Sequence, residues 1–132
     1  MSPNNLGLQD KVGIITGASS GIGEAIAREL SAAGARLVLT ARRADRLTAL
    51  CASLPGPAVA LAADITEPNT AQALLDLALA TYGRADILIN NAGILISGPL
   101  DTIDLDAVAL MTRTNYDSVV RSSYVFARAF KH

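Results

Sequence analysis

The chain has 132 residues, of which 51% are hydrophobic and 17% are charged, and its formal net charge is −1. These values indicate one globular domain with its own core, and they exclude a disordered or strongly charged tail protein. The near-neutral charge offers no attraction for nucleic acid, so we expect no nucleic-acid partner. No apolar run approaches about 18 residues, so we expect no membrane span.

Cysteine and histidine are almost absent from the sequence. The single cysteine, Cys51, excludes an internal disulfide and a cysteine metal cluster, and it suits a reducing compartment. The single histidine, His132, is terminal. We therefore expect no metal site and no histidine-based triad. Residues 1–11 contain no apolar signal core, which favours a cytoplasmic location.

Strand and helix patterns alternate along the chain. Short apolar, β-branched runs predict strands, and apolar spacings of three and four residues that end at glycine or proline predict helices. In chain order we expect strand 11–18, helix 21–34, strand 35–41, helix 44–54, strand 58–64, helix 67–83, strand 85–93, a loop at 97–104 and one long helix over 105–131. This alternation predicts an α/β fold, a doubly wound parallel sheet of the Rossmann type with helices on both faces.

The stretch TGASSGIG, residues 16–23, joins the first strand to the first helix. In a doubly wound sheet this turn lies at the carboxyl ends of the strands, where ligands bind. Gly17 would permit a tight turn, Gly21 would let a pyrophosphate approach the backbone, and Gly23 would let the helix pack closely. The amides at the helix start would then face the anion. The alternative is a glycine-rich turn without a ligand.

The glycine spacing is G-x-x-x-G-x-G, and the sequence NNAG follows at residues 90–93. With these two motifs the chain resembles the N-terminal half of a classical short-chain dehydrogenase/reductase, and the resemblance covers nearly all of residues 1–132. It implies a single dinucleotide-binding domain, incomplete at its C-terminus, with strand order 3-2-1-4 and without the family's C-terminal half.

The end of the second strand bears on the choice of cofactor. An NAD-preferring site has an acidic residue there, which holds the ribose 2′-hydroxyl. This sequence has Ala41 at that position, followed by Arg42 and Arg43, and guanidinium groups attract a 2′-phosphate. We therefore expect NADP(H) to be preferred over NAD(H), with Arg42 as the main contact and Ser19 or Ser20 as hydroxyl partners. The alternative is that the arginines are an ordinary solvated helix start.

The resemblance assigns further cofactor contacts. It places Ile22 in the glycine turn and Asp64 and Ile65 beside the adenine. It also implies that Asn91, Ala92 and Gly93 line the cofactor, with Asn91 tying the sheet together.

Asn115 is the candidate catalytic residue. The spacing puts it on one stripe of the last helix with Val108, Val119, Phe126 and Phe130, which predicts a buried amide that needs hydrogen-bond partners. A satisfied core asparagine is one interpretation. The resemblance implies the other, in which Asn115 anchors a water molecule in a proton relay.

The family's catalytic serine, tyrosine and lysine have no counterparts in residues 1–132. Tyr124 and Arg128 imitate the Tyr-x-x-x-Lys spacing, but Tyr124 is nine residues past Asn115 and would face the opposite side of the helix. Arginine is also a poor substitute for a compact ammonium. We expect this pair, and the neighbouring Ser122 and Ser123, not to be catalytic.

The resemblance implies an NADP(H)-dependent oxidoreductase that transfers hydride between nicotinamide and the carbon of a carbonyl or alcohol substrate. The chain would represent the cofactor-binding half of such an enzyme, and the full-length protein would form a homo-oligomer through its last helix. Two alternatives remain: a catalytically inactive NADP(H)-binding module, and a non-functional fragment.

Overall fold

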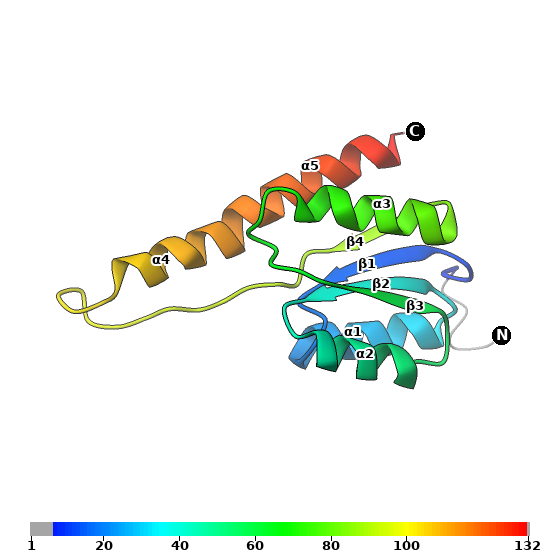
Figure 1. Cartoon of the computed structure of the whole chain (residues 1–132), viewed down its shortest axis with the longest axis horizontal. Coiled ribbons are helices and arrows are strands. Elements are labelled where there is room, and N and C mark those ends of the chain that lie inside the picture. The colour runs from blue at the N-terminus through cyan, green and yellow to red at the C-terminus, as the bar shows by residue number, and fades with distance from the viewer. Residues whose placement is uncertain (1–6, 132) are drawn as a thin grey trace.

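The computed structural model describes residues 7–131. Its strands form one parallel four-stranded sheet in the order β3-β2-β1-β4, which confirms both the fold class and the predicted strand order (Figure 1). The strands are β1 (Val12–Thr16), β2 (Arg36–Ala41), β3 (Ala58–Ala62) and β4 (Ile87–Ile89).

Helices cover both faces of the sheet. Helices α1 (Gly21–Ala32) and α2 (Ala44–Ser53) lie on one face, and α3 (Thr70–Tyr82) lies with the C-terminal helix α5 (Ser118–Phe130) on the other (Figure 1). Successive side chains of a strand point to opposite faces. Ile15 of β1 accordingly packs in the core beneath α1 and α2, while its neighbour Ile14 packs with Phe126 on the side of α3 and α5.

Strand β4 is shorter than the sequence pattern predicts. A strand was expected over 85–93, but only Ile87–Ile89 pair with β1. The next residues turn, because the Asn91 amide donates back to the Ile89 carbonyl at 3.0 Å. The apolar run therefore marks where the chain is partly buried. The hydrogen-bonded pairing with β1 ends at Ile89, four residues before the predicted end at residue 93.

The predicted long helix is continuous but not uniform. It runs as α4 (Leu105–Thr112), the π-helical turn η1 (Arg113–Asp117) and α5. A π turn holds more residues than an α turn and so rotates the side chains that follow it. The buried stripe is consequently Thr114, Ser118, Ser122 and Phe126. The prediction that Asn115 lies on a buried stripe is wrong, since Asn115 is exposed.

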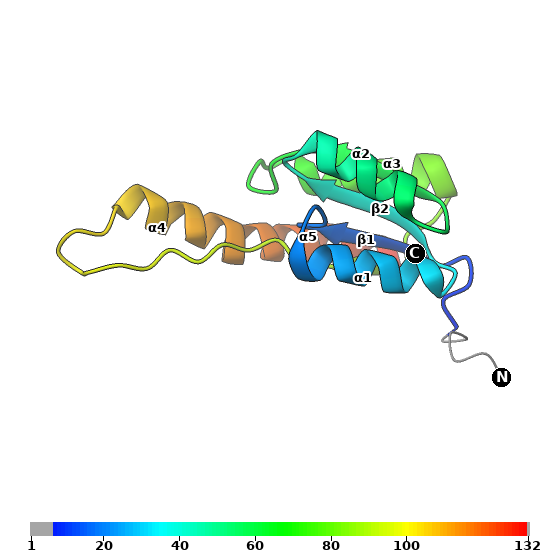
Figure 2. The ribbon, with the colours of Figure 1, turned by 90° about the horizontal axis from the view of Figure 1, so that it is seen from below.

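Residues 94–112, which we call the arm, extend beyond the carboxyl edge of the sheet (Figures 1 and 2). The arm consists of an extended segment that runs outward and α4, which returns beside it. The Ile96 amide donates to Met111 Sδ at 3.3 Å and holds the two parts together. Leu95 and Leu100 on the extended segment are 84% and 97% exposed. Across residues 7–131, no helix combines the length and the apolar character that crossing a bilayer requires.

Candidate functional site

The glycine turn packs directly against the turn that follows β4. Gly17 has φ +64°, a conformation that glycine adopts without strain. A β carbon on Gly17 would also lie only 2.8 Å from Ala92 Cα. The two turns therefore meet backbone to backbone, which only a residue without a side chain permits at this position.

The hydroxyl of Thr16 joins the two turns. It accepts hydrogen bonds from the backbone amides of Asn91 at 3.1 Å and Ala92 at 3.0 Å, and it lies 3.4 Å from the Ile89 carbonyl, to which it donates. A hydroxyl has one donor and two acceptor positions, so its bonding capacity is fully used. Thr16 is 1% exposed. The sequence analysis quoted this residue within its motif but assigned it no role.

The side chain of Asn91 completes this junction. Its Nδ2 donates to the Gly17 carbonyl at 3.1 Å. A β carbon on Gly23 would collide with that carbonyl and with the Asn91 amide. Gly23 thus provides room for the Asn91 contact, in addition to the close helix packing expected from the sequence.

The start of α1 is open to a ligand. Ser20 is the N-cap residue, and its side chain makes no capping hydrogen bond. Gly21 has φ +59°, and a β carbon there would have no atom within 4 Å. The first amides of a helix attract anions, and here neither a capping side chain nor a β carbon blocks them. This backbone therefore fits the pyrophosphate of a dinucleotide.

A cavity of about 410 Å³ lies at this edge of the sheet. Most residues assigned to the cofactor from the sequence line it: Gly17, Ser19, Ser20, Ile22, Arg42, Arg43, Asp64, Ile65, Asn91, Ala92 and Gly93. Gly21 and Gly23 belong to the same turn outside that lining, and Asn115 is also outside it. The sequence analysis missed Thr40, Ala63, Ile94, Leu110 and Thr114, which complete the walls. Thr40 and Ala63 could have been expected from the ends of β2 and β3, whereas the positions of Leu110 and Thr114 depend on how α4 and η1 lie relative to the sheet.

The two arginines at the end of β2 differ in whether they form an ion pair within the described chain. Arg43 is paired with Asp45, with Nε to Oδ1 at 3.3 Å and Nη2 to Oδ2 at 3.2 Å, and this guanidinium lowers the pKa of Asp45. Arg42 has no hydrogen bond or ion pair with any residue from 7 to 131. Arg42 is therefore the guanidinium at the end of β2 that is available to an anion.

Asp64 is a carboxylate at the far wall of the cavity. Its Oδ1 accepts hydrogen bonds from the amide of Thr66 at 2.9 Å and from the hydroxyl of Thr66 at 2.7 Å. These two bonds, and more weakly the charge of Arg42, lower the pKa of Asp64. Asp64 is thus ionised at neutral pH and can accept a hydrogen bond from an amino group such as that of adenine.

Asn115 sits in the π turn and binds the chain after NNAG. Its Oδ1 accepts from the Ile94 amide at 2.8 Å, and its Nδ2 donates to the Ile94 carbonyl at 2.6 Å. The side-chain amide is satisfied at the surface, without the burial that the helix spacing predicted. Its contacts fix the segment that forms one wall of the cavity.

Tyr124 and Arg128 engage each other on the outer face of α5. The Arg128 guanidinium carbon lies 6.0 Å from the centre of the Tyr124 ring, a cation–π contact, and Tyr124 is 62% exposed. Neither residue lines the cavity at the carboxyl edge. Within residues 7–131, no three histidine, cysteine, aspartate or glutamate side chains are grouped so as to hold a metal ion.

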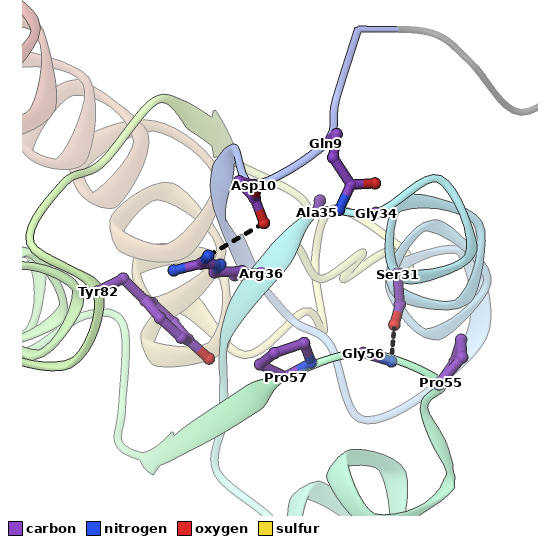
Figure 3. A pocket seen from close by; sticks show the side chains of 10 residues that line it. All are labelled: Gln9, Asp10, Ser31, Gly34, Ala35, Arg36, Pro55, Gly56, Pro57 and Tyr82. Atoms are coloured by element: carbon purple, nitrogen blue, oxygen red, sulfur yellow. Dashed lines mark hydrogen bonds and ion pairs between the residues drawn. The ribbon is translucent and has the colours of Figure 1, made fainter.

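A second hollow of about 350 Å³ lies at the opposite, amino edge of the sheet (Figure 3). Pro57 and Tyr82 are among its walls, and the Arg36 guanidinium beside it donates to Asp10 Oδ1 at 3.0 Å. Its charged groups neutralise each other, and the free helix amides that a phosphate requires belong to the other edge. We therefore place the candidate site at the carboxyl edge.

Comparison with known proteins agrees with this geometry. A family model described as short chain dehydrogenase matches residues 11–132. The chain belongs to the short-chain dehydrogenase family. The fold class and strand order described above are those expected from that resemblance.

Relatives of this short-chain dehydrogenase chain are about twice its length. An uncharacterized oxidoreductase of Staphylococcus saprophyticus is 41% identical over 114 residues, which cover 86% of this chain and 46% of the relative. A metagenomic short-chain oxidoreductase solved in complex with NADP has 37% identity and a TM-score of 0.85, covering 92% of this chain and 57% of that one. A Burkholderia phymatum short chain dehydrogenase/reductase solved in complex with NAD has 30% identity and a TM-score of 0.88, with 92% and 44% covered. The chain thus spans about half the length of these relatives.

The junction between the two turns can be tested at Thr16. We expect Thr16→Val to lower the free energy of unfolding by about 1–3 kcal/mol, because the Ala92 amide loses its acceptor and the Asn91 amide keeps only the Ile89 carbonyl. Chemical denaturation followed by circular dichroism measures this. Thr16→Ser keeps the hydroxyl, so its free energy of unfolding should stay close to that of the parent chain. Equal unfolding midpoints for Thr16→Val and the parent chain would contradict the role given to this hydroxyl.

Proposed function

We propose that these residues form the NADP(H)-binding half of a short-chain oxidoreductase. The bound nicotinamide would supply hydride transfer to or from the carbon of a carbonyl or alcohol substrate. The observation that carries the cofactor assignment is the end of β2, where Ala41 replaces an acidic residue and Arg42 has no partner among residues 7–131. A carboxylate at this position would repel a 2′-phosphate, whereas a free guanidinium attracts it.

The other parts of the cavity support the same assignment. In the proposed complex the amides at the start of α1, from Gly21 to Gly23, bind the pyrophosphate. Asp64 and Ile65 border the adenine, and Ser19 and Ser20 offer hydroxyl groups to the phosphorylated ribose. The turn from Asn91 to Gly93 forms the wall nearest the nicotinamide.

Family membership alone leaves the choice between the two cofactors open. One similar structure was solved with NADP and another with NAD. The residues at positions 41 and 42 therefore carry the preference in this proposal. If Arg42 were merely a solvated surface charge, the protein would bind both cofactors equally.

The cofactor preference can be changed at these two positions. We expect Ala41→Asp combined with Arg42→Gln to weaken NADPH binding by about ten- to a hundredfold, because a charge-assisted contact is lost and a repelling carboxylate is added. The same double variant should bind NADH more tightly. Titration of both cofactors against the parent chain and the double variant measures this. Equal affinity of the parent chain for NADPH and NADH would contradict the proposed role of Arg42.

The proposed site in residues 1–132 contains one residue from the family's proton relay. In the proposal Asn115 holds that relay, and its bonds to Ile94 fix its position beside the cavity wall. None of the tyrosines in this sequence is followed four residues later by lysine. General acid–base catalysis commonly contributes about 10²–10⁴ in rate. Neither tyrosine nor lysine is among the residues that line the described cavity.

We therefore expect a protein of these 132 residues to bind NADPH without oxidising it in the presence of ketones or aldehydes. The measurement is the absorbance of NADPH over time, on material whose mass has been confirmed. A longer chain that contains these residues and a Tyr-x-x-x-Lys segment should be active. Absence of activity there would favour the alternative of an inactive NADP(H)-binding module, and absence of NADPH binding would favour a non-functional fragment.

Turnover by the 132-residue protein would contradict this expectation, and Tyr124→Phe would locate the error. Activity that survives this substitution would mean that another proton donor is present. Activity that disappears with it would show that Tyr124 is catalytic, despite its contact with Arg128 on the outer face of α5.

The outer face of the last helix supports a homo-oligomer as part of the proposal. Tyr116, Val120 and Tyr124 follow one another at four-residue spacing and are 66%, 39% and 62% exposed. Apolar side chains that share one helix face are often covered by a partner. We expect light scattering of a longer chain that contains these residues to give a multiple of its own chain mass, and a strictly monomeric protein would contradict this. With its single cysteine, the protein is proposed to act in the cytoplasm, and recovery from an oxidising compartment after cell fractionation would contradict that.

A further inference from the structure

A shallow hollow between α1 and α2 continues the cofactor cavity on its outer side. It measures about 450 Å³ and is lined by Ser19, Glu24, Arg28, Arg46, Ala49, Leu50 and Ser53. Ser19 also lines the cofactor cavity, so the two spaces adjoin at this residue. Ser19 is therefore a wall that the cavity and the hollow share.

The two arginines of this hollow differ in their engagement. The guanidinium of Arg28 donates to Glu24 at 2.8 Å and to Ser53 at 3.1 Å, so its charge is locally neutralised. Arg46 forms no ion pair or side-chain hydrogen bond with the part of the chain that the structure describes. Arg46 is thus the available cation of this hollow.

The first turn of α2 brings Arg46 close to the end of β2. Helix α2 starts at Ala44, immediately after Arg42 and Arg43, and its N-terminus carries a partial positive charge. Arg43, the second arginine expected from the sequence, is held by both oxygens of Asp45. An anion at Ser19 therefore has Arg42 on the side of the cavity and Arg46 on the side of the hollow, while Arg43 already has a carboxylate partner.

We propose that Arg46 is the second cation of the 2′-phosphate subsite and that the phosphate binds at Ser19 between Arg42 and Arg46. This inference rests on the proposed NADP(H) preference and specifies how that preference is achieved. Arg46 would then be a residue that determines cofactor specificity, because NAD(H) carries no group at this position.

Titration of NADPH and NADH against single variants tests this assignment. We expect Arg46→Gln to weaken NADPH binding by about three- to tenfold, the size of an exposed charge contact to phosphate, and to change NADH binding by less than about twofold. Arg28→Gln is the matched control, because it removes the same charge from the same hollow. It should change the affinity for either cofactor by less than about twofold.

Two further variants separate charge from structure. Arg46→Lys should retain most of the NADPH affinity, because a cation remains at the site. Arg43→Gln should weaken NADPH binding less than Arg46→Gln does. Circular dichroism of each variant checks that it is folded. If Arg46→Gln is unfolded, Arg46→Glu takes its place in the comparison. For Arg46→Glu we expect a larger loss of NADPH affinity.

The outcomes distinguish this inference from the proposed function. A parent chain that prefers NADPH, together with an Arg46→Gln variant that binds NADPH equally well, would overturn the role of Arg46 and leave the proposed function intact. A larger loss for Arg43→Gln than for Arg46→Gln would return the subsite to Arg43. A parent chain that binds NADPH no better than NADH would overturn the proposed preference and this inference together.

Discussion

The hydroxyl of Thr16 holds two turns at one spacing, and the candidate site depends on that spacing. Strands β1 and β4 are parallel neighbours, so the turns that follow them reach the same edge of the sheet. The hydroxyl binds both amides at the start of the NNAG turn, and the Asn91 side chain binds back to Gly17. Because side chains are absent at Gly17 and Gly23, the two backbones can lie in contact. The cavity wall formed by the NNAG turn is thereby fixed relative to the glycine turn that leads into α1.

Local ion pairs decide which charges around the cavity can meet a ligand. The sequence places several arginines near the start of α2 and on α1. From the sequence alone, each of them counts as one positive charge, whether or not it is paired. In the folded chain Arg28 and Arg43 each have a carboxylate within hydrogen-bonding distance. Exposed pairs of this kind add little stability. Among the arginines of α1 and of residues 42–46, they nevertheless leave Arg42 and Arg46 without a carboxylate partner in the part of the chain that the structure describes.

The arm and the last helix connect the candidate cavity to exposed apolar surfaces. Asn115 links the π turn to the segment after NNAG, so the position of the helix and the shape of the cavity wall are coupled. The leucines of the arm and the tyrosines of the last helix are exposed, and the chain spans about half the length of the relatives it matches. In the proposed function those surfaces belong to the rest of the enzyme or to another subunit.

The sequence determined the features that arise from local patterns. Alternating apolar runs and amphipathic helices predicted the parallel sheet, and the glycine and NNAG motifs indicated two turns that line the candidate cavity. The end of β4, the π turn, the hydrogen bonds of Asn115 and the pairing of Arg43 were decided only by tertiary structure. The apolar periodicity of a sequence indicates whether a residue faces the core, but it does not indicate which group is its hydrogen-bond or ion-pair partner. Thr16 and Ala92 are 76 residues apart in sequence, and only the pairing of β1 with β4 brings that hydroxyl to that amide.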